Sequence, residues 1–183
     1  MVNVVQTETT QQIRNEFETS CLELFRSLNC DVTRLEKGEA LDEAPLSYID
    51  AGSEEIEVVI VLRAPLPVLT ITYPRFELDN ILSVDDEKLE DWLSELANQL
   101  VGRFKNKMLN LGCTLSIGLP ELVYDAHGVK LPIEKHQTYR YFFDIDKQCM
   151  ECSLYLRLFN ENMVLTPQQL DSGGAQEGEL EMF

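Results

Sequence analysis

The chain has 183 residues, 44% of them hydrophobic, and its 15 Lys and Arg against 32 Asp and Glu give a formal net charge of −17. This length suits one domain with a substantial core, and the negative charge disfavours nucleic acid and anionic membrane surfaces as partners. No apolar run approaches the roughly 18 residues that span a bilayer, and the first residues lack a basic segment before an apolar core. We therefore expect a cytoplasmic protein.

The cysteines are odd in number and lack the regular spacing of a secreted disulfide framework, so free thiols are expected. Cys149 and Cys152 form a CxxC, but no second pair accompanies them and a strand-like run follows, which is not typical of a zinc or thioredoxin-type site. His127 and His136 stand in a polar region without a metal-ligand pattern. We expect no metal or cofactor bound by this chain.

The first part of the chain predicts one helix and a sheet. Apolar residues recur at three- and four-residue intervals over 9–28, which indicates a helix that ends near residues 29–31. A polar connection is expected over 32–44, followed by two antiparallel strands, 46–49 and 56–62, joined by a turn at 50–53. The alternating run 68–73, bounded by prolines, predicts a third strand, whereas 75–84 is compatible with a helical turn or an irregular wrap.

A long helix is predicted to follow, beginning at the acidic residues 85–87 and ending near Gly112, which suits the position just after a helix. Its apolar arc should face a core and comprises Leu89, Trp92, Leu93, Leu96, Ala97, Leu100, Val101, Phe104 and Met108. The opposite face carries Asp91, Glu95, Asn98 and Gly102, spaced so that they lie side by side. Gly in a helix interior costs roughly 1 kcal/mol relative to Ala, so another surface is expected to approach here. An ordinary solvated face is the alternative.

The last part of the chain predicts more strands and a tail. Short strands are expected at 113–117 and 121–124, and a hairpin at 139–145 and 152–159 with its turn around 146–148. From residue 160 the chain is acidic, lacks Lys and Arg and holds few apolar residues, which predicts a disordered tail. We therefore expect an α+β domain over 1–159, with two main helices packed on a largely antiparallel sheet, and a tail over 160–183.

The order helix, strands, long helix, strands resembles the CheX/CheC/FliY family of chemotaxis phosphatases, and single-site CheX most closely. That family's helical motif is an Asp or Ser, then Glu, then Asn, followed by a proline beyond the helix. Asp91, Glu95, Asn98 and Pro120 stand at the matching positions here. Further positions that match CheX are Gly102, Lys105, Leu109 and Gly112. The specific likeness covers about residues 91–123.

The resemblance implies a phosphatase that hydrolyses the aspartyl phosphate of a CheY-type response regulator in two-component signalling. Asn98 would orient the attacking water and Glu95 would pair with the regulator's lysine, while Gly102 would permit close approach and Asp91 would steer at the rim. Mg²⁺ would be bound by the phosphorylated partner. The family also implies a homodimer.

Two other hypotheses remain at this point. The family places a helix after its first strand pair, whereas the pattern over 65–74 here predicts a strand. This difference and the acidic tail favour a non-catalytic interaction module that binds a response regulator or a flagellar-motor partner. A thiol-redox or zinc protein using Cys149 and Cys152 is the third hypothesis, and it has the least support.

Overall fold

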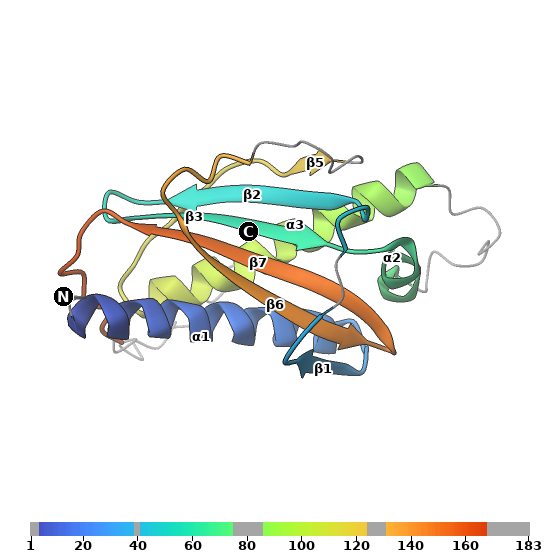
Figure 1. The fold of residues 1–183 in the computed structure, drawn as a ribbon, viewed down its shortest axis with the longest axis horizontal. Coiled ribbons are helices and arrows are strands. Elements are labelled where there is room, and N and C mark those ends of the chain that lie inside the picture. The colour runs from blue at the N-terminus through green and yellow to red at the C-terminus, as the bar shows by residue number, and fades with distance from the viewer. Residues whose placement is uncertain (1–3, 39–40, 75–85, 124–130, 168–183) are drawn as a thin grey trace, which may run out of the picture.

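In the part of the chain that the structure describes, seven antiparallel strands form one sheet, and two long helices pack across one of its faces (Figure 1). The computed structural model describes residues 4–38, 41–74, 86–123 and 131–167. The helices are α1 (Val4–Ser27), α2 (Leu66–Thr72) and α3 (Asp86–Asn110); the strands are β1 (Val32–Leu35), β2 (Leu46–Gly52), β3 (Ile56–Arg63), β4 (Ser116–Ile117), β5 (Glu121–Val123), β6 (Gln137–Ile145) and β7 (Gln148–Leu158). The predicted α+β class, with two main helices on an antiparallel sheet, is confirmed.

The sheet runs in the order β1-β6-β7-β3-β2-β4, and β5 also pairs with β2. Its centre consists of the two predicted hairpins, β2–β3 and β6–β7, which lie side by side through β3 and β7. The second hairpin turns at Asp146 and Lys147, whose φ angles of 48° and 72° are those of a two-residue turn that matches the twist of the strands. The first turns at 53–55, later than predicted, because Asp50 and Ala51 still pair with β3.

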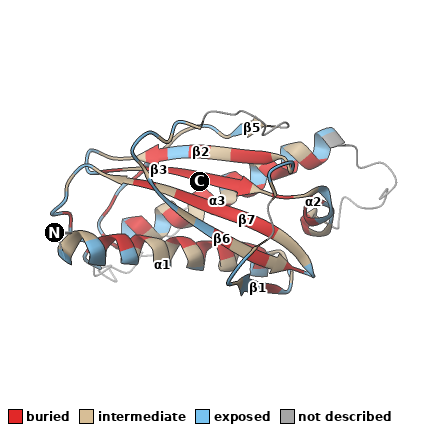
Figure 2. Ribbon diagram, in the orientation of Figure 1, coloured by how far each residue is buried: buried red, intermediate tan, exposed pale blue. Residues whose placement is uncertain are grey.

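The central strands β3 and β7 are mostly buried (Figure 2). The buried side chains of the sheet separate into two clusters, one on each face. The large cluster lies between the sheet and the helices, and its β3 members Ile56, Val58, Ile60 and Leu62 alternate along the strand. The small one holds Leu46, Val59 and Val61 on the other face. The sheet is therefore apolar mainly on the face that α1 and α3 cover.

The structure has a helix, α2, where the sequence predicted a third strand over 68–73, so that prediction is wrong. In α2 the buried residues Val68, Leu69 and Thr72 follow a helical spacing. Pro65 and Pro67 stand at its start, where the first N–H groups of a helix have no partner within it, so proline is tolerated there. The undecided segment 75–84 lies outside the described residues.

The polar connection expected over 32–44 contains a strand that the sequence pattern missed. Residues of β1 pair with β6 from Val32 opposite Ile145 to Leu35 opposite Phe142, at the edge of the sheet. Only Val32 is buried, so backbone pairing rather than side-chain burial holds the strand in place.

The chain remains packed beyond β7. Met163 and Leu165 are buried in the large cluster, the Thr9 hydroxyl donates to the Met163 carbonyl at 2.6 Å, and the Thr166 N–H donates to the Leu111 carbonyl. The folded part therefore continues past the predicted boundary at residue 159, while 168–183 lie outside the described residues.

Candidate functional site

Helix α3 separates its residues into a buried arc and a solvent-facing side, as the 3.6-residue period predicts. All the residues of the predicted apolar arc, from Leu89 to Met108, are buried. On the opposite side Asp91, Glu95 and Asn98 are exposed, and Gly102 is partly exposed. The helix thus brings the four predicted site residues onto one accessible surface, within three turns of each other.

Gly102 leaves a gap in the side-chain surface of α3. Among the described residues, a Cβ built at this position would have no heavy atom within 4 Å beyond its chain neighbours and the helix backbone, so packing against them does not require glycine. The backbone is helical at this point, so conformational freedom does not require it either. What the glycine provides is access to the helix beside Glu95 and Asn98.

The Glu95 carboxylate has a hydrogen-bond partner on its own helix. The Gln99 side-chain Nε2 donates to Glu95 Oε1 at 2.9 Å, one turn along α3. Glu95 itself is exposed, so a cationic group of another protein can reach its carboxylate. Gln99 is not among the site residues predicted from the sequence, although its four-residue spacing from Glu95 places the two side chains next to each other on a helix.

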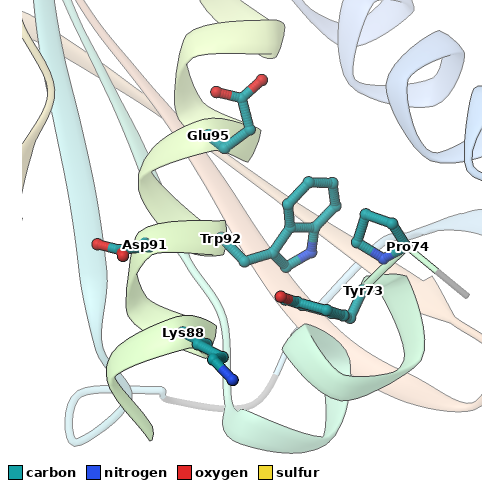
Figure 3. Close-up of a pocket in the computed structure, with 6 residues that line it drawn as sticks. All are labelled: Tyr73, Pro74, Lys88, Asp91, Trp92 and Glu95. Atoms are coloured by element: carbon teal, nitrogen blue, oxygen red, sulfur yellow. The ribbon is translucent and has the colours of Figure 1, made fainter. Parts of the chain in front are cut away.

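A groove of about 410 Å³ borders this surface where the end of α2 meets α3 (Figure 3). Tyr73 and Pro74 form one side, and Asp91, Trp92 and Glu95 are on the other. The Tyr73 and Trp92 rings pack edge to face with centroids 5.8 Å apart, while the carboxylates of Asp91 and Glu95 point away from the indole. The sequence missed this groove because it predicted a strand where α2 lies.

One hydrogen bond fixes the position of α2 against α3. The Trp92 indole Nε1 donates to the Thr72 hydroxyl at 3.0 Å, and both side chains are buried. A buried indole N–H needs such a partner, so this contact orients the tryptophan and with it the wall of the groove.

The sheet carries a separate charged cluster with a structural explanation. Glu151 is 4% exposed and accepts two hydrogen bonds from Arg140, at 2.9 and 2.6 Å, and one from Ser153. Burial raises the pKa of Glu151, but these hydrogen bonds and the charge of Arg140 outweigh it, so the pKa is lowered overall. The carboxylate is fully engaged, which explains its burial without a ligand.

The structure also bears on the cysteine and histidine residues. None of the five cysteines forms a disulfide, and Cys149 and Cys152 point to opposite faces of β7 because they are three residues apart on a strand. Within the described ranges, no three His, Cys, Asp or Glu side chains converge as metal ligands would. His127 lies outside these ranges.

None of the described helices combines the length and apolar character that a membrane-spanning segment needs.

The antiparallel sheet, the helix after its first hairpin and the long helix across it define a CheC/CheX-like fold. No family model matches the chain, and no curated protein matches it in sequence.

Three solved structures illustrate this likeness. A CheC-like superfamily protein from Shewanella sp. PV-4 superposes with a TM-score of 0.64 at 14% identity, covering 80% of this chain and 97% of that one. The chemotaxis protein CheX from Vibrio vulnificus superposes with a TM-score of 0.64 at 13% identity, covering 79% of this chain and 96% of that one. The CheX of a CheX–CheY–BeF3–Mg²⁺ complex from Borrelia burgdorferi superposes with a TM-score of 0.60 at 14% identity, covering 78% of this chain and 96% of that one. At these identities the likeness is one of fold.

Proposed function

We propose that this chain is a phosphatase for the aspartyl phosphate of a CheY-type response regulator. The observation that carries the proposal is the exposed pair Glu95 and Asn98 on α3, beside the gap left by Gly102. The fold supports it, because a protein of similar fold was crystallised as CheX in complex with CheY, BeF3 and Mg²⁺. The helix α2 removes the one difference from the family that the sequence had suggested.

Asn98 is assigned the catalytic role of orienting the attacking water. An acyl phosphate already has a good leaving group, so positioning a water in line with the bond that breaks is a large part of the catalysis that remains to be supplied. A carboxamide can accept a hydrogen bond from the water through its oxygen while its NH₂ group faces phosphoryl oxygens. Mg²⁺ belongs to the regulator in this proposal, and this chain supplies no metal ligand.

Glu95 is assigned the role of holding the two proteins in register. Its free oxygen would pair with the lysine of the regulator's phosphorylation site, and this contact strengthens as the interface excludes water. Gly102 lets the partner's surface approach the helix, and Asp91 lies one turn before Glu95, at the rim of the same surface. We extend the proposal to a homodimer, which light scattering would test.

The experiment compares the lifetime of a regulator's aspartyl phosphate with and without the chain. Asn98→Ala should reduce the acceleration by at least about 100-fold, in line with the loss of one positioned catalytic group. Because Asn98 is exposed, the circular dichroism spectrum and the unfolding midpoint should stay unchanged. Asn106→Ala is the matched control, since Asn106 is an exposed asparagine of the same helix about 12 Å further along.

The same measurement separates the phosphatase from the interaction module. Full acceleration by Asn98→Ala would reject the assigned roles. A wild-type chain that binds the regulator but leaves the lifetime unchanged or prolongs it would instead establish the module, which makes the same contacts without chemistry.

A further inference from the structure

We infer that Gln99 is a positioning residue that presets the Glu95 carboxylate for the partner's cation; this inference rests on the proposed function. The Gln99 Nε2 donates to Glu95 Oε1 at 2.9 Å, so one carboxylate oxygen is engaged before any partner arrives. The second oxygen and the negative charge remain available. Gln99 would act through Glu95 and would not itself touch the phosphoryl group.

The surroundings of Gln99 suit it to this task. Whereas Glu95 is exposed, Gln99 is partly buried and lines a hollow of about 430 Å³ where three helices meet. The other walls include Leu28 and Asn29, which follow α1, and Ile71 near the end of α2. A partly buried side chain has fewer accessible rotamers than an exposed one, so Gln99 can hold its more exposed neighbour Glu95 in one orientation.

At residue 99, the role of orienting Glu95 requires a hydrogen-bond donor that carries no charge. Fixing an exposed glutamate during binding costs rotamer entropy, and a hydrogen bond that exists beforehand removes part of this cost. A lysine at residue 99 would also hold the carboxylate, but its charge would compete with the partner's cation. An amide orients Glu95 without neutralising it.

The chain provides a matched control for an ordinary surface hydrogen bond. On α1 the Gln11 Nε2 donates to Asn15 Oδ1 at 2.8 Å, again one turn along a helix, and both residues are exposed. If the Gln99 contact merely stabilises the helix, Gln99→Met and Gln11→Met should have equivalent consequences. If Gln99 positions Glu95, only Gln99→Met should affect the partner.

The experiment is a double-mutant cycle with Glu95, measured on a CheY-type regulator from the same genome. Gln99→Met should raise KM for the phosphorylated regulator, and its Kd in the BeF3–Mg²⁺ form, about threefold to tenfold, with kcat changed less than about twofold. In the Glu95→Ala background the same change should have no further effect, because there is no carboxylate left to orient. Gln99→Lys should also raise KM, although it restores a donor, and Gln11→Met should not.

An equal effect of Gln99→Met with and without Glu95, or no effect in the wild-type background, would overturn the inference. The NMR signal of the Gln99 side-chain amide in the free protein provides a test that needs no partner. This signal should shift in the Glu95→Ala variant. An unchanged signal would overturn the inference and leave the phosphatase proposal intact. Failure of the wild-type chain to bind any regulator would instead overturn the proposed function.

Discussion

Gly102 lies in the interior of α3 although neither its backbone nor its neighbours require a glycine. Gly102→Ala should therefore stabilise the fold, by about 0.5–1 kcal/mol, because alanine loses less conformational entropy in a helix. The same methyl group should keep a partner's surface away from the helix beside Asn98 and slow dephosphorylation. A rise in stability together with a loss of activity would indicate that the glycine is present to let the partner approach the helix.

Urea unfolding and the regulator's phosphate lifetime measure the two effects on the same sample. Thr19→Ala is a suitable control, because Thr19 is exposed on α1 and its hydroxyl only bonds back to the Asn15 carbonyl. It should raise stability slightly through helix propensity and leave the lifetime alone. Gly102→Ala with unchanged activity would exclude close approach of the partner at this residue.

The ends of the two long helices show how local chemistry sets the elements. After α3, the Cys113 N–H donates to the Met108 carbonyl and the Gly112 N–H to the Leu109 carbonyl, with Gly112 at φ 79°. After α1, the Cys30 N–H donates to the Phe25 carbonyl, with Asn29 at φ 59°. Both helices end in a Schellman motif, once with glycine and once with asparagine in the left-handed conformation.

Substitutions at these two positions should therefore act in opposite directions. Gly112→Ala should destabilise the chain by about 1–2 kcal/mol, because a Cβ is strained at this φ. Asn29→Gly should be neutral or slightly stabilising, since glycine adopts the same conformation without strain. Thermal unfolding of the two variants tests the pair; equal destabilisation by both would argue against the left-handed caps.

At the scale of elements, sequence patterns succeeded where burial on one face decides the structure. The hairpins and α3 were predicted because their apolar residues repeat with the period of a strand or a helix. The pattern failed for α2, where Thr70, Ile71 and Thr72 are β-branched but tertiary packing against α3 favours a helix. It also failed for β1, whose exposed Thr33 and Arg34 give no apolar signal.

The candidate site also has one part that the sequence pattern predicts and one part that it does not. The accessible positions of Asp91, Glu95, Asn98 and Gly102 follow from the helical period of α3, so sequence alone could predict them. The groove beside Trp92 could not be predicted, because it depends on α2, whose residues were predicted to form a strand.

For the whole molecule, charge is the dominant surface property, with 32 acidic residues against 15 basic ones. The described ion pairs engage few of these carboxylates; two of them join Arg34 to Glu18 and Lys107 to Glu23. Such partly exposed pairs contribute little individually, so they do not compensate for the net repulsion. Folding brings the excess negative charges closer together than in the unfolded chain, and the repulsion between them opposes the compact state.

Salt should therefore stabilise this chain near neutral pH. Raising NaCl from about 10 mM to about 150 mM shortens the Debye length from roughly 30 Å to 8 Å and screens the repulsion, which should raise the unfolding midpoint by about 2–4 °C. Near the sequence pI of about 4.4 the net charge vanishes, and the effect should disappear or reverse because attraction between opposite charges then balances or outweighs the repulsion. Differential scanning calorimetry at both pH values provides the measurement. If salt raised the unfolding midpoint equally at both pH values, the cause would be general exclusion of salt from the protein surface rather than the net charge.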